Sequence, residues 1–140
     1  YTGRLIKLDQ KTMLTIPPGI RSGSRITANG QTFRIDIQAD TKFKRSDNDL
    51  LVDIDISSIE AIIGIDVELT HLDNTRLQFT VPAGIQSGQI VKLGKKGMPD
   101  PKSSSHGDLL ARITVYTPKD LTPDEKKQIK ALFRRNSIKV

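Results

Sequence analysis

The sequence predicts an all-β protein made of two tandem small domains of the β-sandwich or barrel type, with one short helical turn and a C-terminal α-helix. Three observations predict this fold class. Short segments of alternating apolar and polar residues recur along the chain. Pro, Gly, Asp and Asn residues separate these segments at short intervals, which is typical of compact sandwiches and barrels. A nine-residue motif occurs twice, which indicates an internal duplication.

The clearest strand signals lie in four segments of alternating side chains, residues 31–37, 50–56, 77–81 and 108–116. In the first of them the alternation places Phe33, Ile35 and Ile37 on one face, which we expect to point inward. In the second it places Val52, Ile54 and Ile56 on one face and Asp53 and Asp55 on the other. One apolar face and one polar face are typical of a sheet with a single side on the core. We therefore expect half-buried β-sheet over most of the chain.

Two helical segments interrupt this pattern. A single helical turn is expected at residues 57–63. Near the end of the chain, Thr122 and Glu125 form a capping box around Pro123 at the first helical position. An apolar stripe at i, i+3 and i+4 follows, made of Ile129, Leu132 and Phe133. We predict a helix of about three turns that docks through this stripe.

The internal duplication divides the chain into two repeats. Thr-Ile-Pro-Pro-Gly-Ile-Arg-Ser-Gly at 15–23 recurs as Thr-Val-Pro-Ala-Gly-Ile-Gln-Ser-Gly at 80–88. In both copies Pro fixes φ where a strand ends, and the glycines supply turn conformations that other residues resist. Residues 1–3 align with residues 62–64, so the opening strand of the first repeat is absent from these 140 residues. We expect a truncated first domain at 1–46, a second domain at 47–140, and a natural protein that extends upstream.

The composition argues against several function classes. There is no Cys, so disulfides and thiolate metal sites are excluded and a reducing compartment fits. No apolar run approaches the ~20 residues that span a bilayer. The two histidines, His71 and His106, have no neighbours in sequence that fit a well-oriented catalytic triad. We therefore predict no enzyme activity, no metal, no cofactor and no membrane partner.

An ordered set of motifs resembles the tandem C-terminal β-domains of the DnaJ family of heat-shock co-chaperones. The two Pro-x-Gly-Ile turns belong to the set, as does Phe-Lys-Arg-Ser-Asp-Asn-Asp-Leu at 43–50. The others are Tyr-Thr-Gly at 1–3, Glu-Ala-Ile-Ile-Gly at 60–64, Gly-Lys-Lys-Gly-Met-Pro at 94–99, Gly-Asp-Leu at 107–109 and Pro-Lys-Asp-Leu-Thr at 118–122. Each motif alone is weak, but the ordered set is specific and covers almost the whole chain.

The resemblance implies a non-enzymatic, cytoplasmic co-chaperone of the stress response. Its first β-domain would bind unfolded client polypeptides, its extreme C-terminus would form a homodimer, and it would work with a DnaK-type ATP-driven chaperone. That chaperone is activated through an N-terminal J domain, whose His-Pro-Asp signature is not in these residues. Because the chain has no Cys, the resemblance is to the zinc-free subclass.

The resemblance also implies where clients bind. Ile6 and Leu8 share one face of an alternating segment, and Phe43 would lie beside them in the client groove. An extended client can add to a strand edge by main-chain hydrogen bonds while apolar pockets select its side chains. The alternative is that these three residues are ordinary core residues.

Two further alternatives stay open. The stripe of Ile129, Leu132 and Phe133 either packs on the second domain or joins two copies of the chain. DNA binding is the second function considered, because the formal net charge is +6. The basic residues are, however, dispersed among acidic ones rather than gathered in one run.

Overall fold

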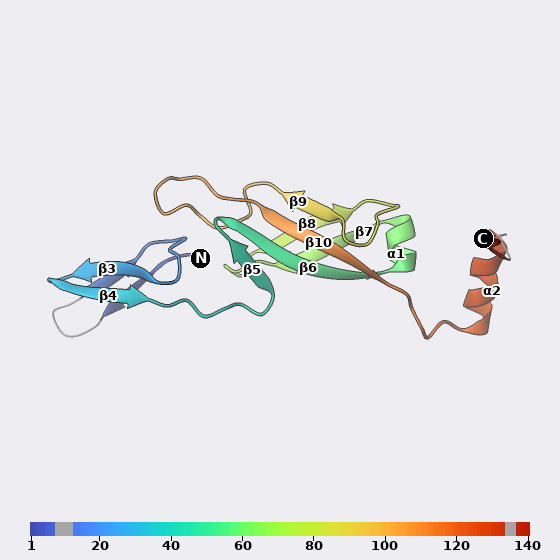
Figure 1. The fold of residues 1–140 in the computed structure, drawn as a ribbon, viewed down its shortest axis with the longest axis horizontal. Helices are drawn as coiled ribbons and strands as arrows, with labels where there is room; N and C mark the ends of the chain where they lie inside the picture. The colour runs from blue at the N-terminus through green and yellow to red at the C-terminus, as the bar shows by residue number, and fades with distance from the viewer. Residues whose placement is uncertain (8–12, 134–136) are drawn as a thin grey trace.

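The computed structural model describes residues 1–7, 13–133 and 137–140. Within these ranges the chain is mostly β, with two short helices (Figure 1). In chain order the elements are β1 (Arg4–Lys7), β2 (Met13–Ile16), β3 (Ser24–Ala28), β4 (Gln31–Ile35), β5 (Phe43–Ser46), β6 (Asp49–Ser57), α1 (Ser58–Ile63), β7 (Ile65–Thr70), β8 (Arg76–Val81), β9 (Ile90–Leu93), β10 (Leu109–Tyr116) and α2 (Pro123–Leu132). The predicted all-β class with a short helix and a C-terminal helix is confirmed.

The first repeat consists of two antiparallel hairpins, β1–β2 and β3–β4. The turn between β3 and β4 is Asn29-Gly30, and both residues have positive φ, as a tight two-residue hairpin turn requires. β4 ends at Ile35, and the side chain of Ile37 is 46% exposed. The prediction that Ile37 points inward is therefore wrong, because the residue lies beyond the end of the strand.

The second repeat is built around a four-stranded sheet in the order β5-β6-β10-β9, with the hairpin β7–β8 packed against it. The two central strands, β6 and β10, run parallel, while β5 and β9 are antiparallel to their neighbours. β5 and β6 form a tight hairpin, so the domain boundary expected between residues 46 and 47 falls in its turn. The sheet of the second repeat therefore begins at Phe43.

The core lies between this sheet and the hairpin β7–β8. Val52 on β6 and Leu109, Ala111 and Ile113 on β10 have at most 1% of their surface exposed. Burial of a Val, Leu or Ile side chain contributes about 1.5–3 kcal/mol, so these central strands hold much of the stability. The alternation predicted for Val52, Ile54 and Ile56 is borne out on the inner face of β6.

Hydrogen bonds confirm that the two repeats are copies of one another. The amide of Gly23 donates to the carbonyl oxygen of Ile35 at 2.7 Å, and the amide of Gly88 donates to that of Ile113 at 2.7 Å. The hydroxyls of Ser22 and Ser87 accept from the amides of Ile37 and Val115 at 2.9 and 3.0 Å. These pairs align β3–β4 with β9–β10 residue by residue.

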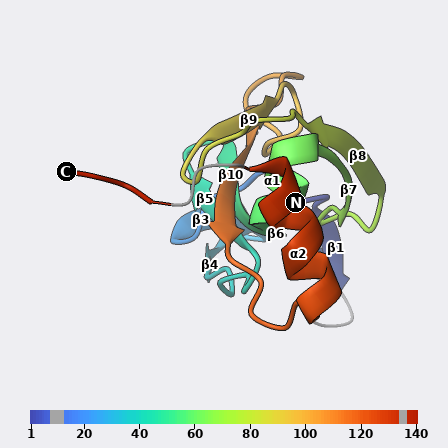
Figure 2. The same ribbon diagram turned by 90° about the vertical axis from the view of Figure 1, so that its right-hand side faces the viewer.

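The two helices begin at capping boxes. Ser57 and Glu60 exchange hydrogen bonds at the start of α1, and Thr122 and Glu125 do so at the start of α2, as predicted. The bonds from Ser57 hold the pKa of Glu60 below its usual value. None of the side chains of α2 is buried, and the helix lies at the end of the molecule beyond the sheet (Figures 1 and 2). The prediction that α2 docks through its apolar stripe is therefore wrong, because the segment 117–121 carries it past the end of β10.

Candidate functional site

A groove with a volume of about 760 Å³ lies where the two repeats meet. The second repeat supplies most of its apolar lining, and the first repeat and the segment 37–40 supply the rest. The lining residues are Tyr1, Arg21, Ser22, Ile37, Gln38, Ala39, Asp40, Phe43, Lys44, Arg45, Asp47, Leu50, Leu72 and Met98. A concave, mostly apolar surface with a few polar groups is typical of a binding site.

The floor of the groove is held by packed rings. Phe43 of β5 is 6% exposed and packs in the core with Leu50 and Met98. Its ring lies 5.7 Å from that of His71, and the ring of Tyr1 lies 4.7 Å from that of His71. Burial, and then the charge of Asp73, raise the pKa of the Tyr1 hydroxyl. The neutral phenol is therefore favoured at this apolar surface.

His71 joins the hairpin β7–β8 to the glycine-rich loop at residues 94–97. Its Nδ1 atom accepts a hydrogen bond from the amide of Leu72 at 2.8 Å, so the proton of the neutral ring lies on Nε2. Nε2 then donates to the carbonyl oxygen of Lys96 at 2.7 Å. Both ring nitrogens are satisfied within the structure, so His71 has a structural role beneath the groove and is not placed for acid–base chemistry.

Arg45 connects β5 to the turn of the first repeat. Its Nη1 and Nη2 atoms donate to the carbonyl oxygens of Ile20 and Gly19 at 2.8 and 2.6 Å, and Nε donates to the carbonyl oxygen of Asp47 at 2.6 Å. Partial burial, followed by the nearby charge of Arg21, lowers the pKa of the guanidinium. Arg45 therefore spans the two repeats at the edge of the groove.

Gly19 makes the close approach at this junction possible. Its φ is +75°, and a Cβ added there would lie 1.8 Å from the carbonyl oxygen of Pro99. Any larger residue would force the turn away from the loop that carries Pro99. The junction thus rests on a backbone contact at Gly19 and on the Arg45 clamp, which consists of the hydrogen bonds from the Arg45 side chain to Gly19 and Ile20.

The outer edge of β5 borders the groove. The amide of Leu50 donates to the carbonyl oxygen of Asp108 on the β10 side, so Leu50 does not exchange hydrogen bonds with its partner Arg45. In an antiparallel ladder, the main-chain groups of Arg45 and Phe43 consequently point to the outer edge. Asp40 accepts from the amide of Phe43 at 2.9 Å, and the bonds from Phe43 and Lys42 lower the pKa of its carboxyl group. The Phe43 carbonyl and both main-chain groups of Arg45 are therefore left on the outer edge of β5, and both residues line the groove.

The structure brings only part of the sequence-predicted client site to this groove. Phe43 lines it. Ile6 lies on β1 opposite Leu14, is half-buried and is not part of the groove lining. Leu8 lies outside the described residues. The stripe proposed for dimerisation is exposed on α2, most of all at Leu132 (86%), with Ile129 and Phe133 beside it.

Sequence reasoning missed Tyr1, Leu72 and Met98 as groove residues. They come from three distant segments, and no local pattern could have brought them together. One feature of the sequence pointed to Arg45: it alternates with Lys44, which is exposed, and lies on the same strand face as Phe43. That spacing placed it on an inner face but gave no partner for its charge.

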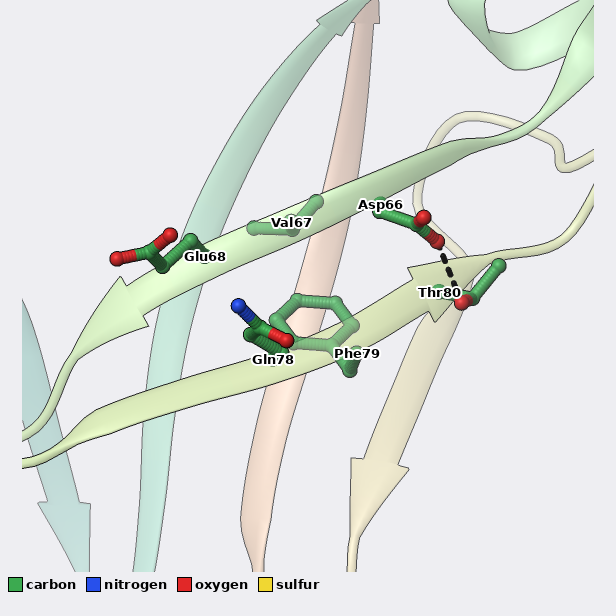
Figure 3. Close-up of a pocket in the computed structure, with 6 residues that line it drawn as sticks. All are labelled: Asp66, Val67, Glu68, Gln78, Phe79 and Thr80. Atoms are coloured by element: carbon green, nitrogen blue, oxygen red, sulfur yellow. Dashed lines mark hydrogen bonds between the residues drawn. The ribbon is translucent and has the colours of Figure 1, made fainter.

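A second hollow, of about 360 Å³, lies on the β7–β8 hairpin. It is lined by Asp66, Val67, Glu68, Gln78, Phe79 and Thr80 (Figure 3). Thr80 donates to Asp66 at 2.6 Å, while Val67 and Phe79 pack towards the core. The exposed lining is polar and acidic, so this hollow does not suit an apolar segment.

Among the described residues, no group of three His, Asp or Glu side chains could hold a metal ion. No helix among them is both long enough and apolar enough to cross a membrane.

Comparison with known proteins gives a consistent result. The family model of the DnaJ C terminal domain matches residues 5–118. Chaperone protein DnaJ 2 of Aquifex aeolicus is 33% identical over 132 residues, covering 84% of this chain and 35% of the relative. Chaperone protein DnaJ of Chlamydia abortus is 32% identical over 139 residues, covering 89% of this chain and 36% of the relative. Chaperone protein DnaJ of Roseiflexus is 27% identical over 142 residues, covering 92% of this chain and 38% of the relative.

The chain thus spans about a third of the length of these relatives. The family match extends from β1 through β10 and includes every lining residue of the groove except Tyr1. The ordered motifs, the duplicated hairpins and the matching family model agree, and the chain belongs to the DnaJ C-terminal domain family.

Proposed function

We propose that the chain binds extended apolar segments of unfolded polypeptides, as the client-binding part of a DnaJ-type co-chaperone that delivers clients to a DnaK-type chaperone. The observation that carries this proposal is the outer edge of β5, whose main-chain groups border an apolar groove of about 760 Å³. In this proposal the chain makes the client contact, and the partner chaperone performs the ATP-driven step.

The contact has two components. Main-chain hydrogen bonds from a client to Arg45 and Phe43 are independent of client sequence, because every residue except Pro carries the same main-chain donor and acceptor. Alternate client side chains then point into the groove, where Leu72, Met98 and Ile37 offer apolar contact. This division supports binding of many different clients with a preference for large apolar side chains.

Phe43 and Ile37 contribute in different ways. Phe43 lines the groove with only 6% of its surface exposed, so it shapes the floor and also supports the core. Ile37 also lines the groove and is 46% exposed, so its side chain is open to a client. A change at Ile37 therefore tests the groove without removing a core residue.

The experiment compares Ile37→Asp with Ile90→Asp, a matched change at a residue of β9 that is 53% exposed and outside the groove lining. Binding of a labelled apolar peptide would be followed by fluorescence anisotropy, and the melting temperature would be measured for each variant. We expect Ile37→Asp to weaken binding about tenfold, because a carboxylate would lose water when an apolar client side chain covers it. Ile90→Asp should leave the affinity unchanged. If both variants keep their folds and bind the peptide with equal affinity, the groove is not the client-binding site.

A further inference from the structure

Two arginines, Arg21 and Arg45, line the groove beside the end of β5. The Nη2 atom of Arg21 lies 3.4 Å from the carboxylate of Asp47, and both side chains are more than half exposed. Arg45 donates instead to three main-chain carbonyl oxygens, those of Gly19, Ile20 and Asp47. No carboxylate within residues 1–7, 13–133 and 137–140 forms an ion pair with Arg45. The two guanidinium groups are therefore matched by the carboxylate of Asp47 alone.

A partly buried arginine without a counter-ion favours the approach of an anion. Burial, and then the like charge of Arg21, lower the pKa of Arg45, because both disfavour its charged form. The carbonyl oxygens satisfy its N–H groups but do not neutralise its charge. An exposed pair such as Arg21 with Asp47 contributes little, so Arg21 can exchange Asp47 for another carboxylate. This part of the groove therefore favours one further negative charge.

Two other charged residues of the lining lie away from this pair of arginines. Asp40 lies before the start of β5, and its carboxylate accepts hydrogen bonds from two backbone amides. Lys44 lies on the other face of β5, close to Asp53. The unmatched positive charge is therefore located at the end of β5 that Arg45 and Asp47 occupy.

We propose that the groove selects client segments with an Asp or Glu two positions from a large apolar residue, and that Arg21 sets this preference. Side chains of an added strand share a face with the residues opposite them, with a period of two. Phe43 and Arg45 are two positions apart on one face of β5, and their main-chain groups lie on its outer edge. A client on this edge therefore places one side chain at Phe43 and the next but one at Arg45 and Arg21. The inference rests on the proposed function and adds the chemical class of the client to it.

Matched peptides test the preference on the 140-residue chain. The peptides carry Glu, Gln or Lys two positions from a central Leu, either before or after it, and have acetylated and amidated ends so that the side chain is the only carboxylate. Fluorescence anisotropy gives each affinity. In at least one of the two orders, the Glu peptide should bind at least about threefold more tightly than the Gln peptide, and the Lys peptide more weakly than both. High salt should reduce the preference, because it screens exposed charges. The favoured order gives the direction of the client along β5.

The peptides also supply a control for spacing. When Glu is moved to the position next to Leu, its side chain lies on the opposite face of the added strand from Leu. The Glu and Gln peptides of this spacing should therefore bind with nearly equal affinity.

Variants of the chain assign the preference to Arg21, and the readout is the ratio of the Glu-peptide affinity to the Gln-peptide affinity. This ratio is insensitive to any general loss of binding. Arg21→Gln should bring the ratio to about one, and Arg21→Glu should make the Lys peptide the tightest of the three. Arg25→Glu makes the same change of charge at an exposed residue of β3 outside the groove lining, and it should leave the ratio as it is.

The outcomes separate this inference from the proposed function. If the apolar peptides bind but Glu, Gln and Lys give equal affinities, the inference is wrong and client binding by the groove stands. The inference is also wrong if Arg21→Glu and Arg25→Glu change the ratio alike. If none of the peptides binds, the proposed function fails and the inference fails with it.

Discussion

The Nη2 atom of Arg45 lies 2.6 Å from the main-chain oxygen of Gly19, so the side chain of a β5 residue ends on the turn of the first repeat. This bond and its neighbour to Ile20 tie β5, which lines the groove, to the turn of the first repeat. We expect Arg45→Ala to destabilise the chain by roughly 1–3 kcal/mol, because the carbonyl oxygens of Gly19, Ile20 and Asp47 lose a charged donor. Urea unfolding measures the change. Arg76→Ala, which removes an exposed arginine paired with Glu68, is the matched control and should cost at most about 1 kcal/mol.

The same clamp predicts an effect on binding. Arg45→Ala should lower the affinity for an apolar peptide even at a temperature where the variant is fully folded. The reason is that β5 and the turn of the first repeat are no longer tied together beside the groove. Arg45→Lys keeps the charge but cannot reach both carbonyl oxygens with a planar fork, so it should behave more like the Ala variant than like the unaltered chain. If Arg45→Lys bound peptide normally, positive charge alone would account for the role of Arg45.

Gly19 and Gly84 occupy the same position in the two repeats, and their surroundings differ. Both have positive φ, but an added Cβ meets the carbonyl of Pro99 at Gly19 and open space at Gly84. Gly84→Ala should cost about 1 kcal/mol from backbone strain alone. Gly19→Ala should cost clearly more, since the turn must also move away from Pro99. Thermal unfolding of the two variants measures the difference, and equal losses would show that the contact with Pro99 yields easily.

Strand addition at β5 predicts a period of two in the client. Methylation of peptide nitrogens that face Arg45 and Phe43 should weaken binding, because each removes a main-chain donor from the ladder. Methylation of the intervening nitrogens, which point away from β5, should have a smaller effect. A series of singly methylated peptides measured by calorimetry would test this. A uniform response along the peptide would indicate side-chain contact without a shared ladder.

Asp108 makes the stability of the second repeat dependent on pH. Its carboxylate accepts from the amide of Lys95 at 3.0 Å and contacts Lys92 at 3.2 Å, and these contacts lower its pKa. A lowered folded-state pKa gives stability that is present above the unfolded pKa, about pH 4, and is lost as pH falls through the folded value. Asp108→Asn should therefore reduce the loss of stability below about pH 4, measured by urea unfolding across pH. Asp55→Asn, on the exposed face of β6, is the matched control.

The exposed stripe on α2 predicts self-association of the chain. Leu132 is 86% exposed, so Leu132→Glu should leave the melting temperature unchanged while it weakens any contact between two helices. Sedimentation at increasing concentration measures this contact. Ile62→Glu, at a residue of α1 that is 69% exposed, controls for the loss of apolar surface elsewhere. An unaltered chain that stays monomeric at high micromolar concentration would rule out self-association through α2.

Local sequence signals were sufficient for the strands and the helix caps. Alternation at Val52, Ile54 and Ile56 depends only on which face is buried, and the capping boxes depend on residues three positions apart. Sequence could not predict that the stripe of α2 is left exposed, because a stripe indicates an apolar contact and not its partner. Ile37 continued an alternating pattern past the point where the strand ends.

The candidate site was predicted only in part, for a related reason. Phe43 was singled out through the resemblance, and its place in the groove follows from contacts with Leu72 and Met98, which are far away in the sequence. Ile6 had the expected alternation but lies in a different hairpin. Alternation identifies a face of a strand, whereas a groove depends on how separate sheets meet.

The parallel pairing of β6 with β10 has a consequence for the order in which the chain is made and folded. Asp53 and Arg112 lie 59 positions apart, so the centre of the sheet cannot close until nearly the whole second repeat has been synthesised. Contacts this distant along the chain slow folding, because the loop between them must be ordered first. Until β10 emerges from the ribosome, β6 is an apolar strand with one unpaired edge, and unpaired edges of this kind promote aggregation. During its own synthesis, therefore, this chain passes through a state that resembles the polypeptides it is proposed to bind.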